Sequence, residues 1–297
     1  MRRAVVLFAV LGCAPARVSA PAVAPAAYEI RVRRPSRVGE RTAVVVDSTI
    51  DESNKTYTDQ VLLKNEHTRA HLHLDAVAET REIDALGLPV RTDFTIRSFT
   101  KDGSALAAPG KHVVVVSAPA KKDARVEVDG SPAGDELREA VDDVVPIARA
   151  GDPDTIFGAH AAKRVGDAWS FDKGAMVHEL ARTGVLTKPS AVDGRVSLAS
   201  VARVGGVDCV DLRIDLAVSE FAPAKPLPDG SEITRGRLTL RIDEELPVDA
   251  RSPRRADETV VHAEFEAFVP VKDQAEVAGV TVERVTDRTR RATYTPL

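Results

Sequence analysis

Apolar and polar residues alternate one by one in five separate segments of this 297-residue chain. A period of two is that of a β-strand with one buried face and one solvated face. Because antiparallel sheets tolerate a wet face, the pattern predicts antiparallel pairing. A sixth segment, His112–Ser117, has apolar residues on both faces and is typical of a central strand. The alternating segments are 70–78, 125–128, 211–218, 237–242 and 261–267.

Helical spacing is clear in one part of the chain. An amphipathic helix is predicted over 135–145, with Ser131-Pro132 as its start and Pro146 as its end. Asp152-Pro153 predicts a short second helical turn, and 175–183 is a further helix candidate. The apolar face of the first helix comprises Leu137, Ala140, Val141, Val144 and Val145.

Three short motifs recur about 127 residues apart, which indicates two related halves, 28–150 and 151–297. The alternative is shared turn chemistry, since Asp-Gly and Val-Gly are common turn formers. We predict a mainly β (α+β) protein in which two antiparallel halves form a sandwich or a curved half-barrel, with one amphipathic helix between them. The two halves are expected to be able to form one globular unit. The recurring motifs are Arg37-Val38-Gly39-Glu40 with Arg164-Val165-Gly166-Asp167, Asp102-Gly103-Ser104 with Asp229-Gly230-Ser231, and Gly110-Lys111-His112-Val113 with Gly236-Arg237-Leu238-Thr239.

The N-terminus has the layout of a secretory signal. Arg2-Arg3 precedes an apolar run over 4–12, and Val10-Leu11-Gly12 before Cys13 predicts a signal peptide over 1–12 and a lipid on Cys13. A competing cut after Val18-Ser19-Ala20 would leave Pro21 first, which disfavours it. A third possibility is a buried helix or strand of a cytosolic protein. The Pro- and Ala-rich residues that follow, up to 27, are typical of an extended tether.

The signal peptide and the lipid on Cys13 predict a protein of the bacterial cell envelope that is bound to a membrane through this lipid. Ala14 after Cys13 favours the outer membrane, and the alternative is a secreted or periplasmic protein. If Cys13 carries a lipid, Cys209 has no cysteine left to pair with and is predicted to be a small buried thiol.

Charge and aromatic content exclude several classes of partner. The formal net charge is −4, and loss of Arg2 and Arg3 with the signal would make it −6. No basic block is present, so we expect no nucleic-acid partner. Aromatic residues make up 4% of the chain and Trp169 is the single tryptophan. This disfavours carbohydrate and aromatic-cage sites, which depend on such rings.

The central segment Arg164-Val165-Gly166-Asp167-Ala168-Trp169 leads a tryptophan into a strand. It resembles the G-D-x-W step of uncharacterised bacterial lipoproteins with a β-rich body. Those proteins share a lipidated cysteine, a short helix before the step and a long-stranded second half. The resemblance covers the layout of residues 28–297 and implies neither an activity nor catalytic residues.

One group of residues has the spacing of metal ligands. On a strand, His71, His73 and Asp75 share the polar face, and His67 is placed to fold back towards them. The alternative is a solvated strand face that happens to hold histidines. His178-Glu179 begins like a zinc-protease helix, but Arg182 stands where that motif needs its second histidine.

Signatures of catalysis are missing from the sequence. It has no Gly-x-Ser-x-Gly elbow and no glycine-rich phosphate loop before a helix. We therefore expect a non-catalytic protein without a cofactor, with a binding or structural role at the envelope. The alternatives are a carrier for a hydrophobic small molecule, in a half-barrel closed by the helix at 135–145, and a metal-binding protein that uses His67, His71, His73 and Asp75.

Overall fold

The computed structural model describes residues 26–117, 124–145, 152–271 and 278–297. The signal, Cys13 and most of the tether lie outside these residues, and so does Pro146.

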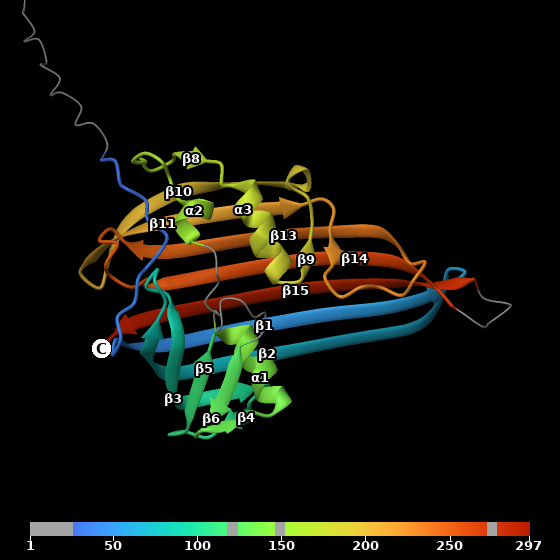
Figure 1. Cartoon of the computed structure of the whole chain (residues 1–297), viewed down its shortest axis with the longest axis horizontal. Helices are drawn as coiled ribbons and strands as arrows, with labels where there is room; N and C mark the ends of the chain where they lie inside the picture. The colour runs from blue at the N-terminus through green and yellow to red at the C-terminus, as the bar shows by residue number, and fades with distance from the viewer. Residues whose placement is uncertain (1–25, 118–123, 146–151, 272–277) are drawn as a thin grey trace, which may run out of the picture.

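Thirteen strands form one open antiparallel sheet, which confirms the prediction of a mainly β fold (Figure 1). In chain order its strands are β1 (Arg41–Thr58), β2 (Val61–Ile83), β3 (Pro89–Lys101), β4 (Ser104–Ala107), β5 (His112–Val116), β6 (Arg125–Val128), β7 (Ser131–Pro132), β8 (Ala168–Trp169), β10 (Val192–Val204), β11 (Val207–Val218), β13 (Glu232–Pro247), β14 (Ala256–Pro270) and β15 (Gly279–Pro296). A separate two-stranded sheet pairs β9 (Val185–Leu186) with β12 (Ala222–Pro223). All five segments with alternating residues, and residues 112–116 of the sixth segment, lie on strands of the large sheet.

The first and the last strand of this sheet are neighbours in its middle. β1 pairs with β15 over sixteen consecutive residue partners, from Thr42 with Pro296 to Tyr57 with Thr281. On one side of this pair the sheet continues through β2, β3, β5, β6 and β7, and on the other through β14, β13, β11, β10 and β8. In both halves the strands therefore follow one another across the sheet in the same direction, as a tandem repeat would place them.

The repeated Arg-Val-Gly-acid motif forms the same turn in both halves. Gly39 donates to the carbonyl of Thr80 on β2, and Gly166 donates in the same way to Leu198 on β10, each at 2.8–2.9 Å. In each turn the acidic side chain accepts from the amide of the arginine three residues earlier. Both glycines have positive φ, +82° and +90°, which favours glycine there. The duplication itself stays a prediction, with this geometry in its favour.

In the described part of the chain, three helices lie on one face of the sheet, and a short 3-10 turn follows the third helix along the chain (Figure 1). They are α1 (Asp135–Val144), α2 (Pro153–Phe157), α3 (Lys173–Arg182) and η1 (Pro189–Ala191). α1 covers the N-terminal strands, while α2 and α3 cover the C-terminal strands. The single helix expected between the halves is α1, and the candidates at 152–153 and 175–183 correspond to α2 and α3.

The predicted start of the first helix was wrong. Ser131 and Pro132 form β7, paired with Val128 and Glu127 on β6. The reason is the turn between them: Asp129 and Gly130 both have positive φ and reverse the chain tightly. Gly134 takes the N-cap position instead, and α1 begins at Asp135.

Each half has its own apolar core under its helices. Under α1, the residues Ala140, Val141 and Val144 pack on the even-numbered face of β1 and β2, which includes Val46 and Leu72. Under α2 and α3, the core combines strand residues of β10, β11 and β13 with the N-terminal segment through Ile30 and Val32. Fully burying each such side chain contributes roughly 1.5–3 kcal/mol, so these two cores hold the helices on the sheet.

Candidate functional site

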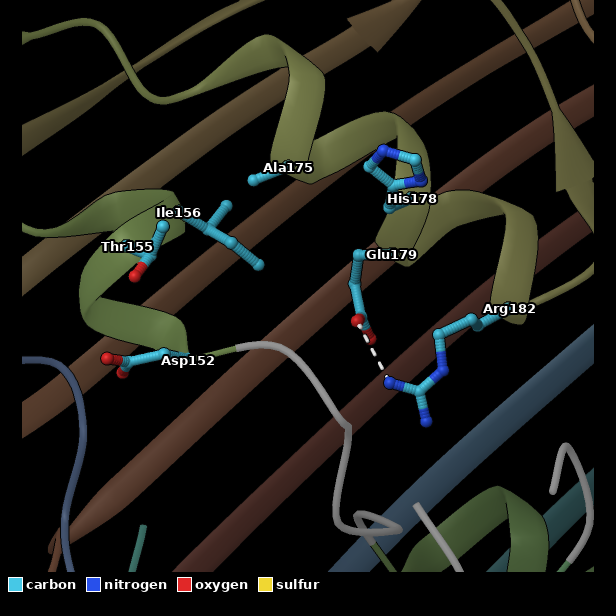
Figure 2. A pocket seen from close by; sticks show the side chains of 7 residues that line it. All are labelled: Asp152, Thr155, Ile156, Ala175, His178, Glu179 and Arg182. Carbon is cyan, nitrogen blue, oxygen red and sulfur yellow. Dashed lines mark ion pairs between the residues drawn. The ribbon is translucent and has the colours of Figure 1, made fainter. Parts of the chain in front are cut away.

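A hollow of about 300 Å³ opens between α2 and α3 (Figure 2). We call it the α2–α3 hollow. Its wall combines one apolar side chain from each helix, Ile156 and Ala175, with polar and charged side chains. The lining residues are Asp152, Thr155, Ile156, Ala175, His178, Glu179 and Arg182.

The N-terminal segment of the chain fixes α2 in place. Asp152 caps the helix by accepting from the amide of Asp154, and Pro153 occupies the first helical position. The carboxylate of Asp154 accepts from two consecutive backbone amides, Val32 at 2.6 Å and Arg33 at 3.0 Å. The Arg33 guanidinium also reaches Asp152 at 3.3 Å. These contacts join segments more than 115 residues apart and set one wall of the hollow.

Trp169 holds the other end of α2. Its indole Nε1 donates to the carbonyl of Phe157, the last residue of α2, at 2.9 Å. The ammonium of Lys163 lies 5.4 Å from the centre of the indole ring. Phe157 in turn packs edge-on against Phe171, just before α3. The tryptophan of the Gly-Asp-Ala-Trp step therefore links the sheet to both helices.

Three polar side chains of the hollow come from α3. Asp172 caps this helix through the amide of Ala175, and one turn further on Glu179 and Arg182 form an ion pair with 3.7 Å between Oε2 and Nη1 (Figure 2). Glu179 is buried and His178 lies exposed beside it. A carboxylate, a guanidinium and an imidazole thus line the same hollow as the buried side chain of Ile156. The sequence at 178–182 excludes a zinc-protease helix but does not predict this hollow, because the approach of α2 to α3 leaves no local signal.

The predicted metal ligands lie on the opposite face of the sheet, away from the helices. His67 pairs with Asp51 at 2.6 Å, His71 and His73 both pair with Asp47 at 3.6 and 2.8 Å, and Asp75 pairs with Arg97 at 3.5 Å. The structure brings His71 and His73 together at one carboxylate but directs His67 and Asp75 to other partners. Within the described ranges, no three His, Cys, Asp or Glu side chains are grouped so that they would hold a metal ion.

A buried charge cluster occupies the helix face of the sheet between the two cores. Asp257 accepts from Arg290, from Tyr294 and from Arg254, and Arg254 also pairs with Glu244 at 3.1 Å. Glu244 raises the pKa of Arg254, and burial raises the pKa of Tyr294 to about 12. The Arg290 guanidinium also donates to the carbonyl of Val144 at the end of α1, at 3.0 Å. The cluster therefore connects three strands to the first helix.

Cys209 is buried in β11, as predicted from its position beside a strand. Burial raises the pKa of its thiol, so it is held in the unreactive protonated form. None of the helices in the described part of the chain is long and apolar enough to cross a bilayer.

No protein-family model matches the chain, and no curated protein matches it. A similar solved structure is that of a DUF1329 family protein from Desulfovibrio piger, which is 10% identical, with 82% of this chain and 83% of that chain covered and a TM-score of 0.19. At this identity and TM-score, the similarity defines neither a family nor a function for this chain. The fold defines a mainly β protein that is built on one open antiparallel sheet, with helices on one face and the α2–α3 hollow between two of them.

Proposed function

We propose that this chain is a non-catalytic binding protein of the bacterial envelope, anchored by a lipid on Cys13, and that it binds a small amphipathic molecule in the α2–α3 hollow. The observation that carries the binding role is the combination of the apolar side chains of Ile156 and Ala175 with the ion pair of Glu179 and Arg182. An amphipathic ligand would place its carbon skeleton on the former and its polar end on the latter.

The size of the hollow limits what it binds. About 300 Å³ lies at the lower end of the range for small-molecule sites, roughly 300–1,000 Å³. The strand face beneath α1, by contrast, is filled by residues such as Phe99 and Leu74. The hydrophobic-carrier alternative therefore narrows to a compact ligand held between α2 and α3, rather than one enclosed under the first helix.

Fluorescence of 8-anilinonaphthalene-1-sulfonate, an aromatic anion with an apolar body, tests this site. Ala175→Trp would fill the hollow and is expected to weaken probe binding at least tenfold. Ala162→Trp adds the same ring on an exposed loop outside the hollow and should leave binding unchanged. Equal affinity in all three proteins would contradict the proposed site.

The anchor is tested separately, by mass spectrometry of the mature N-terminus and by membrane fractionation. We expect a diacylated or triacylated Cys13 as the first residue and loss of membrane association in Cys13→Ser. An unmodified N-terminus at Pro21 would contradict the anchor but leave the binding site untouched.

The metal-binding alternative has no specific observation in its favour. Each of its four side chains already lies within 2.6–3.6 Å of a charged side chain on a neighbouring strand. It remains a prediction that titration calorimetry with zinc decides.

A further inference from the structure

We propose that two copies of this chain associate through the free edge of β2, joining their sheets into one. This inference rests on the strand edge alone and is independent of the α2–α3 hollow.

The edge is long and open. β3 pairs with β2 only from Leu72 onward, so that Val61–Ala70 has β1 on one side and no strand among the described residues on the other. Every side chain from 61 to 69 is exposed. Such an edge is a template for another strand unless charge or shape blocks it.

The direction of the backbone groups follows from His71. Its amide donates to the carboxylate of Asp102 and its carbonyl accepts from the Asp102 amide, both on the side away from β1. The β1–β2 register is regular from Lys64 to Glu79. Because these groups alternate along a strand, Asn65, His67 and Arg69 also direct their N–H and C=O groups to the open edge.

The charges on this edge complement themselves in one antiparallel register. With Asn65 facing Asn65 of a second copy, Lys64 faces Glu66 and Glu66 faces Lys64. Opposite charges directly across a strand pair stabilise it, and the Asn65 pair would exchange two backbone hydrogen bonds. Lys64 and Glu66 already lie on one face of β2, 2.8 Å apart, so four charges would alternate around the two-fold axis.

Apolar side chains flank this charged centre. Val61, Leu62 and Leu63 are 61%, 49% and 58% exposed at the tip of the β1–β2 hairpin. The β1–β2 register skips Leu63, so these residues would lie against the region of residues 67–69 of the second copy without a strict pairing, and the aliphatic stem of Arg69 would cover apolar surface there. In a monomer these three consecutive aliphatic side chains stay exposed to water, whereas in the dimer they would be partly covered.

Sedimentation velocity over a series of concentrations tests the proposal. We expect a concentration-dependent dimer for the full chain and an increase of about tenfold or more in its dissociation constant for Lys64→Glu or Glu66→Lys. The double swap Lys64→Glu/Glu66→Lys should restore the dimer. Lys188→Glu makes the same charge change on an exposed residue of the other half and should have no effect. A monomer at all concentrations, or a double swap that fails to restore the dimer, would overturn the proposal.

Two further variants test the register and the backbone pairing. Asn65→Cys should cross-link to itself under mild oxidation, whereas Thr68→Cys should not, because it would lie far from its own copy. Asn65→Pro removes an outward amide without touching the β1–β2 ladder and should abolish the dimer, with an unchanged circular dichroism spectrum confirming the fold. Equal cross-linking of both cysteine variants would contradict the register.

Discussion

The hydroxyl of Tyr294 on β15 donates a 2.8 Å hydrogen bond to the carboxylate of Asp257 on β14. The same carboxylate accepts from Arg290, whose guanidinium also reaches the last turn of α1. Asp257 is thus the shared acceptor of a buried cluster between the two apolar cores. Because one carboxylate serves several donors, its removal affects both halves of the protein.

We expect Asp257→Asn to lower the free energy of unfolding by about 3–5 kcal/mol, because it removes the carboxylate that pairs with the buried Arg290 guanidinium, whereas Arg254 keeps Glu244. Chemical denaturation measures this. Glu258→Gln is the matched control: Glu258 is the next residue on β14, but its partner Arg291 lies on the solvated face. A loss as large for the control would contradict a special role for the buried cluster.

Tyr294 makes this cluster sensitive to alkaline pH. Burial and the neighbouring Asp257 raise the pKa of its phenol to about 12 from an ordinary value near 10. The folded state therefore retains a proton that the unfolded chain loses first. The contribution of the protonated Tyr294 phenol to the free energy of unfolding is complete below pH 10. It is lost as the pH rises through about 12, and the loss amounts to about 2–3 kcal/mol. The difference between wild type and Tyr294→Phe, measured by denaturation at several pH values, should isolate this loss. Parallel pH profiles for the two proteins would contradict it.

Part of the sheet was predictable because a strand with one buried face has alternating apolar and polar residues in its sequence. The alternation over 211–218 and 261–267 reflects one face on a core and one in solvent, and both segments are strands. No strand was predicted over β1, and the outer part of β2 was missed because residues such as Glu66 are polar or exposed whichever face they occupy. The pairing of β1 with β15 joins residues about 240 positions apart and leaves no local signal. The α2–α3 hollow was missed for the same reason.

The matched turns at Gly39 and Gly166 allow a test of their equivalence. A Cβ at either position would meet no atom within 4 Å, so that the cost of alanine is purely one of backbone conformation. We expect Gly39→Ala and Gly166→Ala to destabilise the protein by similar amounts, about 1–2 kcal/mol each. Gly134→Ala is the control for the added methyl group, since Gly134 has ordinary φ and equally open surroundings; its N-cap position sets an expected loss of a few tenths of a kcal/mol, below that of either turn. A loss confined to one of the two turns would argue against their equivalence.

The bond from Trp169 to the carbonyl of Phe157 couples the sheet to the proposed binding site. Trp169→Phe keeps an aromatic ring at this position but removes the donor, so that the C-terminal end of α2 loses its tie to β8. We expect a stability loss of about 1–3 kcal/mol, and a weaker affinity for the naphthalene probe because Thr155 and Ile156 on α2 line the hollow. Titration of the probe, together with hydrogen exchange at α2, measures the two effects.

Lys163→Met serves as the control, since it removes only the cation beside the indole ring and leaves its N–H in place. If Trp169→Phe lowers stability but the probe affinity stays at the wild-type value, α2 does not shape the site. If the affinity falls and exchange rises at α2 alone, the tryptophan acts through the position of this one helix.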